Sequence, residues 1–415
     1  MTGKQIDITV SQPDRTEAES DDEPMFPRYD GPAFLSYGFR PFFLGASLFG
    51  GVAVPVWVLI FAGASHSSFL STPRAWHVHE MLFGFLPAVI TGFLLTAIPN
   101  WTGRPPLRGI PLLSLWILWL AGRLLLAVPW PTLVVPAIVD GAFLVVLAAL
   151  VWREIAAGGS WSQAPIGVVI SLYAGANVLF HVLALHGAAT DLPERMALAL
   201  IMLLLTMIGG RVTPNFTREF LVREHKIALP ASLSRVDGVS IVLVVVGSLA
   251  WIVQPESLAA GGLLVAAGLA NLMRLSRWRG WMVWREPLVL ILHLGYGWLV
   301  LSLLALGGAM LGIGLPAANA VHVLTTGAVG AMTLAVMTRA SLGHTGRLKH
   351  ADAITVLIYV LVNLGAMLRV FVPTPDAPTA LTHLMLGLAA VGWSGAYVLF
   401  ALIYGPFLLR PSLDE

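Results

Sequence analysis

Twelve apolar runs, each long enough to cross a bilayer, constrain this 415-residue chain more than any other feature. A membrane-spanning helix needs about 20 mainly apolar residues. Charged residues make up only 11% of the chain, roughly half of what soluble domains carry. The sequence therefore predicts an all-α, polytopic membrane protein. The runs cover residues 42–63, 76–98, 110–128, 132–152, 165–187, 193–210, 235–254, 257–274, 287–310, 317–338, 353–372 and 381–404.

Basic residues between the runs predict the orientation. Most Arg and Lys residues lie in the loops after even-numbered runs, whereas the loops after odd-numbered runs carry little beyond Arg74. By the positive-inside rule, both the N and C termini are expected to be cytoplasmic. Because topology explains the basic residues, the pI near 9.0 does not indicate nucleic-acid binding. Residues 1–30 are acidic and lack an apolar core, which predicts a disordered cytoplasmic tail before a single transmembrane domain at 31–410.

An internal repeat joins two of the runs. Residues 79–104 and 322–347 align without a gap: both begin with His, share Gly five residues on, and end in Thr-Gly-Arg. The stretch PNFTR at 214–218 echoes PNWTGR at 99–104, which gives a partial third copy with Glu194 in place of the histidine. This pattern predicts three pseudo-symmetric four-helix units with sites at their interfaces. The alternative is chance similarity between helices rich in small residues.

The stretch WHVHEMLFGF, residues 76–85, places His77, His79 and Glu80 at the start of an apolar run. His77 and His79 differ by about 200° on a helix and so face nearly opposite directions. Glu80 can orient an imidazole through its N–H. By the repeat, His322 has the role of His79, and the two would sandwich a haem iron or ligate one metal each. The alternative is that these side chains are hydrated at the membrane–water interface and have no ligand.

Other histidines are further candidates for ligands. His181 follows Asn177 by one turn on the same helix face, and His383 lies near the end of a run. His293 is followed by glycines at 295 and 297, which would let a flat ligand approach closely. His181 and His383 can each equally be a histidine that only hydrogen-bonds a backbone carbonyl.

Two further features concern charge. His344 lies in a tight loop, and Arg347 beside it would neutralise a propionate or phosphate, unless it is only a topology anchor. Arg123 and Asp140 lie at similar depth in adjacent runs, which predicts a structural ion pair.

The chain contains no cysteine, which excludes disulfides, iron–sulfur clusters and thiolate metal ligands. Any metal must then be held by His, Met, carboxylate or backbone groups. There is no Walker motif, GxSxG, HExxH or CxxCH in the sequence.

Several motifs together resemble the NnrS family of bacterial membrane proteins, over nearly all of residues 30–405. The motifs are GFRPFFL (38–44), HVHEMLFGF (77–85), GFLLTAIPNWTGR (92–104), GGRVTPNFT (209–217), HLGYGWL (293–299) and HVLTTGAVGAMTLAVMTRASLGHTGR (322–347). The resemblance implies haem and copper, with a role in denitrification and nitric-oxide stress. The cysteine-free chain, with histidines at matching depth, suits a b-type haem or imidazole-bound copper. The resemblance also implies that the metal-ligand candidates are His77, His79, His293, His322 and His344.

The residues and the resemblance together imply a haem- and copper-binding protein of the bacterial inner membrane, and the resemblance implies that it acts in nitric-oxide metabolism or nitrosative-stress protection. Its expected partners are nitric oxide or a related small molecule, membrane lipid and an unidentified electron donor. Whether it is a haem–copper redox enzyme stays open. The alternatives are a secondary transporter and a non-catalytic sensor of metal or nitric oxide.

Overall fold

Each of the twelve apolar runs is helical in the computed structural model of the protein, which describes residues 29–63, 72–374 and 378–413. Apart from residues 29 and 30, the described residues belong to one unit, Gly31–Glu415. The tail predicted over residues 1–30 lies almost entirely outside the described residues.

Eleven helical stretches are long and apolar enough to cross a membrane, and a twelfth, Ile110–Leu126, is shorter at 17 residues. Within the described ranges no strand is present. The prediction of an all-α, polytopic membrane protein is therefore confirmed. The helices are α1 (Phe39–Phe61), α2 (Pro73–His79), α3 (Leu86–Thr102), α4 (Ile110–Leu126), α5 (Val134–Ala157), α6 (Ala164–Leu185), α7 (Asp191–Leu204), α8 (Gly210–Arg223), α9 (Arg235–Val253), α10 (Leu258–Ser276), α11 (Pro287–Met310), α12 (Ala317–His322), α13 (Gly330–Gly343), α14 (Ala353–Val370) and α15 (Ala380–Leu409).

Three spans are interrupted by a π-helical segment: η2 (Glu80–Phe85), η4 (Leu205–Gly209) and η6 (Val323–Val329). In the two aligned copies of the repeat, α2 ends at His79 and α12 ends at His322, and the π segment begins at the next residue. The sequence repeat therefore extends to the position of a backbone irregularity. In the partial copy, the π segment begins well after Glu194, so this copy differs.

Side chains from neighbouring spans satisfy the carbonyl groups that the π segments displace. The Tyr173 hydroxyl donates to the Leu82 carbonyl, and the Trp119 Nε1–H donates to the Gly84 carbonyl at 2.9 Å. Arg274 donates to a carbonyl of η4 at 2.7 Å. Irregular backbone is tolerated at membrane depth where buried protein groups complete its hydrogen bonds, as they do here.

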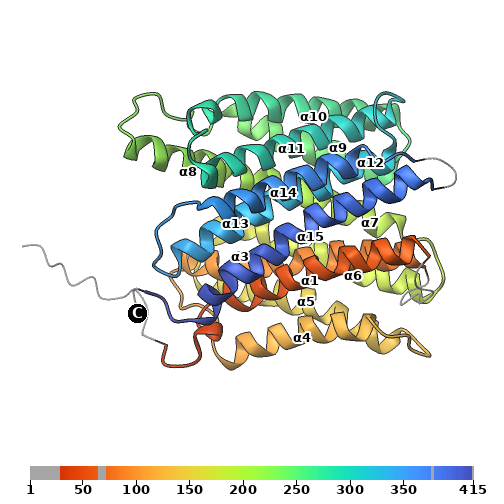
Figure 1. Ribbon diagram of the computed structural model, residues 1–415, viewed down its shortest axis with the longest axis horizontal. Helices are drawn as coiled ribbons and strands as arrows, with labels where there is room; N and C mark the ends of the chain where they lie inside the picture. The colour runs from red at the N-terminus through yellow and green to blue at the C-terminus, as the bar shows by residue number, and fades with distance from the viewer. Residues whose placement is uncertain (1–28, 64–71, 375–377, 414–415) are drawn as a thin grey trace, which may run out of the picture. The chain divides into compact units, whose positions relative to one another are not determined.

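The first and last spans are neighbours, because α1 packs along α15 (Figure 1). The outer faces of many helices expose large apolar side chains, such as Val52, Val242 and Val391. Charged side chains from several spans are buried instead. Apolar side chains outside and charged side chains inside are the reverse of a soluble protein and suit a surface in contact with lipid. The buried charges must therefore compensate one another.

Candidate metal centre

Six polar side chains meet in the buried interface of four spans. They come from the start of the second span and from α4, α5 and α6, and each is at most 4% exposed. Such groups are costly in a membrane interior unless they satisfy one another, so a buried cluster is a candidate for function. The residues are His79, Glu80, Arg123, Asp140, Asn177 and His181.

A short helix with strong start signals brings the chain to this interface. The Thr72 hydroxyl accepts a hydrogen bond from the Ala75 N–H at 3.1 Å, and Pro73 occupies the first turn. The helix changes to the π form directly after His79. Both His79 and the adjacent Glu80 are buried, so each finds its partners inside the bundle.

A glycine in η2 makes room for a guanidinium group. A Cβ atom on residue 84 would collide with Arg123 Nη1. With Gly84 there, Arg123 donates to Glu80 Oε2 at 2.7 Å and forms an ion pair with Asp140 Oδ1. The ion pair predicted between Arg123 and Asp140 is therefore present, and Glu80 joins it.

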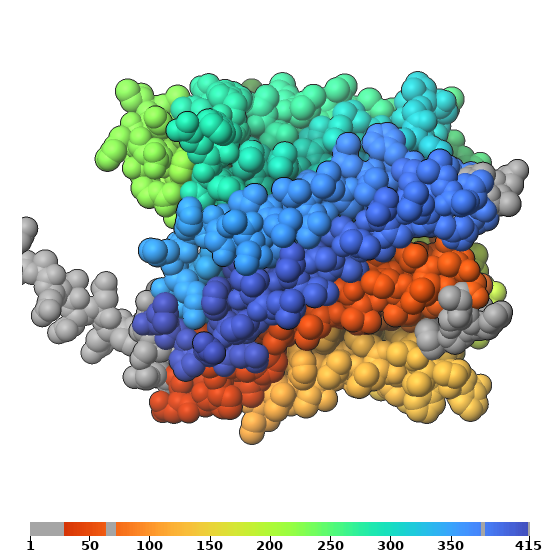
Figure 2. All heavy atoms as spheres, in the orientation of Figure 1, coloured from red at the N-terminus to blue at the C-terminus, as the bar shows by residue number. Residues whose placement is uncertain are grey.

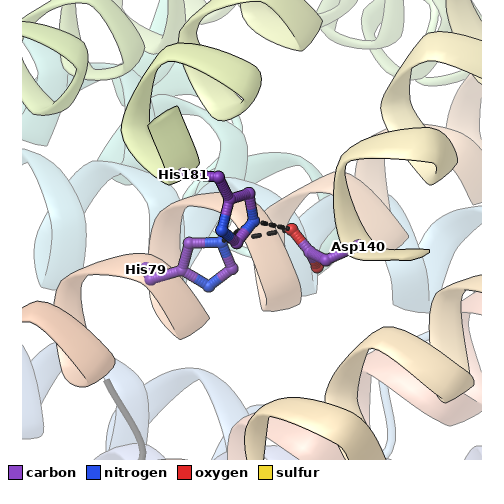
Figure 3. A group of neighbouring side chains, drawn as sticks. All are labelled: His79, Asp140 and His181. Atoms are coloured by element: carbon purple, nitrogen blue, oxygen red, sulfur yellow. Dashed lines mark hydrogen bonds and ion pairs between the residues drawn. The ribbon is translucent and has the colours of Figure 1, made fainter. Parts of the chain in front are cut away.

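Three ligand-type atoms form a triangle at the centre of the cluster. His79 Nε2 lies 3.2 Å from both His181 Nε2 and Asp140 Oδ2, and His181 Nε2 lies 2.7 Å from the same oxygen. Figure 3 shows both imidazoles beside Asp140. In a tetrahedral zinc site with metal–nitrogen distances near 2.0 Å, neighbouring ligand atoms are about 3.3 Å apart. A small outward shift would therefore let the triangle hold a metal ion, and no second such group occurs among the described residues.

The hydrogen bonds around His79 cannot all be satisfied while its imidazole is neutral. The Glu80 carboxylate only accepts, so His79 Nδ1, 3.0 Å from Oε1, holds the proton and Nε2 has a lone pair. Asn177 Nδ2 donates to Asp140 at 3.0 Å, which turns its Oδ1 toward His79 Nε2 at 3.2 Å. Turning the amide over would only place Oδ1 against the Asp140 carboxylate. A cation at Nε2, either a proton or a metal ion, removes this conflict.

The formal charge of the cluster leads to the same conclusion. Glu80 and Asp140 contribute two negative charges and Arg123 one positive charge, so the sum is −1 with neutral imidazoles. An uncompensated charge in a protein interior is strongly destabilising. A bound cation supplies the missing positive charge, and imidazole ligands suit copper, zinc and iron.

His77 and His322 lie in a different environment. The His77 ring stacks on Trp57 with ring centroids 4.6 Å apart, and His322 Nδ1 donates to a carbonyl of its own helix at 2.6 Å. Arg369 interacts electrostatically with both imidazoles. A fixed positive charge disfavours a metal cation nearby. His79 and His322, predicted to be equivalent from the repeat, thus have unlike surroundings.

His293 and His383 are also outside the cluster. His293 Nε2 lies 2.8 Å from the Thr217 hydroxyl, which itself donates to a backbone carbonyl, so His293 is the donor to Thr217. The His383 ring is exposed and lies 5.8 Å from the Phe61 ring.

His344 and Arg347 follow α13 and pack against aromatic rings. The His344 ring lies 5.7 Å from the Phe39 ring, and burial together with Lys349 lowers the pKa of His344. The Arg347 guanidinium lies 4.1 Å from the centre of the Phe407 ring. Neither residue contacts the cluster around His79.

The sequence singles out all six members of the cluster but does not join them. The spacing of Asn177 and His181 and the adjacency of Glu80 to His79 were correct local signals. Asp140 was interpreted only as a partner of Arg123. The sequence signal for a further role of Asp140 is an excess of negative charge: two carboxylates, Glu80 and Asp140, accompany one arginine.

The fold and this cluster define a multi-pass α-helical membrane protein with a candidate metal centre buried between its spans. The family model described as NnrS protein matches residues 33–412, and the chain belongs to this family. The resemblance seen in the sequence motifs is thereby confirmed. No curated protein is similar enough in sequence to count as a relative.

Proposed function

We propose that the protein binds copper at His79, His181 and Asp140 and acts on nitric oxide in the bacterial inner membrane. The observation that supports copper is the buried triangle of two imidazoles and a carboxylate, one positive charge short of neutrality. Imidazole-bound copper can bind small ligands and exchange electrons. Membership of the NnrS family supports the nitric-oxide role.

The residues around the triangle would prepare it for a metal. Glu80 holds the Nδ1 proton of His79, which fixes the tautomer and aims the Nε2 lone pair at the centre. Arg123 neutralises part of the carboxylate charge. Asn177 Oδ1 faces the same point and offers a further oxygen.

We also propose a b-type haem, which the family resemblance supports. The cluster itself does not fit a haem, because the Nε2 atoms of His79 and His181 are 3.2 Å apart and leave no space for a porphyrin between them. A haem would need another site in the chain.

Metal analysis and spectroscopy of the detergent-purified protein test the proposal. We expect bound copper, a Soret band that shifts on reduction, and anaerobic consumption of nitric oxide with an electron donor. His79→Ala should remove the copper, whereas His186→Ala should not, since His186 is exposed at the end of α6. Nitric-oxide consumption no faster than that of free haem would overturn the catalytic role and leave a binding or sensing protein.

A secondary transporter is the second candidate, and the three interrupted spans favour it. Transporters commonly build substrate sites from broken helices. A colourless, metal-free protein from cells supplied with haem and copper would support this candidate over the metal proposal.

We further propose that both termini face the cytoplasm, as the distribution of basic residues suggests. The cysteine-free chain allows a direct test with single cysteines at exposed loop positions. A membrane-impermeant maleimide should label Thr132→Cys, and not Ser162→Cys, in intact spheroplasts. Labelling of Ser162→Cys and not Thr132→Cys would show that the termini face the periplasm.

A further inference from the structure

A groove on the outer surface has features that the metal proposal does not use. It lies between α11 and α14 and has a volume of about 910 Å³. Aliphatic side chains from both helices line it, including Leu294, Leu301, Val360 and Leu364. Figure 2 shows α14 and α15, in blue, crossing the visible face between the green helices and the red and orange ones.

The polar groups in the groove are already satisfied. Trp298 Nε1–H donates to Asn363 Oδ1 at 2.8 Å, and Asn363 Nδ2 donates to a carbonyl of its own helix at 2.8 Å. His293 is engaged by Thr217. The groove therefore offers an apolar surface along its length, which suits an acyl chain.

Aromatic and basic side chains gather at one end of the groove, in the segment RWRGWMVWRE at 277–286. Trp284 lines the groove and is 62% exposed, and the Arg285 guanidinium lies 4.6 Å from its ring centre. Arg279 lies 5.6 Å from the ring centre of Trp281, which is 61% exposed. Exposed tryptophan beside arginine is typical of the membrane–water boundary.

The two arginines at this end lack a counter-charge. Within the part of the chain that the structure describes, Arg279 and Arg285 form no ion pair. By contrast, Arg277 lies 3.9 Å from Asp237, and Arg223 lies 3.5 Å from Glu286. The groove thus begins at two exposed, uncompensated positive charges.

We propose that this groove binds an anionic phospholipid, with an acyl chain between α11 and α14 and the phosphate at Arg279 and Arg285. Basic pockets between spans recognise anionic headgroups in this way. A quinone would leave both arginines without a counter-ion. A second copy of the chain packed on this face would bring these positive charges toward one another.

Native mass spectrometry of the full-length protein, titrated with dioleoyl phosphatidylglycerol or dioleoyl phosphatidylcholine, tests the site. We expect tighter binding of phosphatidylglycerol, and about a tenfold loss in the variant Arg279→Gln/Arg285→Gln. The matched control Arg153→Gln/Arg410→Gln removes two exposed arginines that lie outside the segment 277–286 and should bind as the wild type does.

A second variant tests the groove separately from the charges. A Cβ at Gly297 would have only Leu275 Cδ2 near it, at 4.0 Å, so Gly297→Leu fits the fold and fills the groove. It should also weaken phosphatidylglycerol binding while copper content stays unchanged. Equal binding of the two lipids, wild-type binding by the double arginine variant, or a retained quinone or a dimer on this face would overturn the proposal.

Discussion

The cluster around His79 and the cluster around Arg274 both form where a π segment interrupts a span. In each, a glycine admits a guanidinium group: Gly84 makes room for Arg123, and Gly210 makes room for Arg274. Each arginine then forms an ion pair with a buried aspartate from a neighbouring span. The two regions therefore share a π-helical interruption of the span and a buried Arg–Asp ion pair.

They differ in whether their polar groups are matched. Arg274 donates to Asp237 Oδ1 at 2.6 Å and to the Tyr296 hydroxyl at 2.9 Å, and Tyr296 donates to Asn271 Oδ1 at 2.6 Å. Asp237 also lies 3.9 Å from Arg277, so no carboxylate is in excess there. The His79 cluster has an extra carboxylate, and with a neutral imidazole two acceptor atoms, His79 Nε2 and Asn177 Oδ1, face each other at 3.2 Å. A buried ion pair whose charges are compensated thus indicates a structural role. An excess of negative charge around such a pair indicates a binding site for a cation.

The largest expected effect comes from removing a ligand. His79→Ala or His181→Ala should weaken copper binding by more than about 100-fold, because hydrogen-bond partners of ligands alone are worth about 10–100-fold. His322→Ala should keep its copper, since His322 bonds its own helix beside Arg369. Metal analysis of the three variants decides this, and loss of copper from His322→Ala would restore the equivalence that the repeat predicts.

Arg274→Gln should produce the largest loss of stability without loss of metal. It removes the nearest positive charge from the buried Asp237, which keeps only the 3.9 Å contact with Arg277, and this should cost up to about 3–5 kcal/mol in the free energy of unfolding. Replacing both partners, as Asp237→Asn/Arg274→Met, should recover much of this loss, because Asn removes the buried charge and still accepts from the Ser234 N–H in the capping box. Thermal unfolding in detergent measures the stability, and a change in copper content would mean that the two clusters are coupled.

Glu80→Gln preserves the shape of the side chain but removes the charge that holds the His79 proton. We expect copper affinity to fall by about 10–100-fold while the three ligands remain. Competition with a copper chelator measures the affinity. Unchanged affinity would show that Glu80 serves only as a partner of Arg123.

The smallest effects should come from the two glycines. Gly84→Ala and Gly210→Ala each push on a guanidinium and should destabilise the fold by about 1–3 kcal/mol. Only Gly84→Ala should also weaken copper binding, because only Arg123 contacts the acids of the metal cluster. Equal loss of copper in both variants would contradict the conclusion that only the cluster around His79 binds the metal.

The spans could be predicted because length and apolar composition are local properties, and the contact between His79 and Glu80 could be anticipated because the residues are adjacent. The contact between His79 and His181 joins residues 102 positions apart and depends on how α6 packs against the second span. The repeat correctly related His79 to His322 in backbone position. It could not reveal the neighbours Asp140, Asn177 and His181, because they come from spans that the alignment does not cover. Only Glu80, which aligns with Val323, lies within it.

The π segment in the second span has a consequence for how this protein can change over evolution. One extra residue in a helical turn shifts the register of all that follows by about 100°. Deleting one residue between Glu80 and Phe85 would restore a regular helix and rotate the half that bears His79 relative to α3. The insertion lets one half of the span be selected for its ligands while the other half keeps its own packing register.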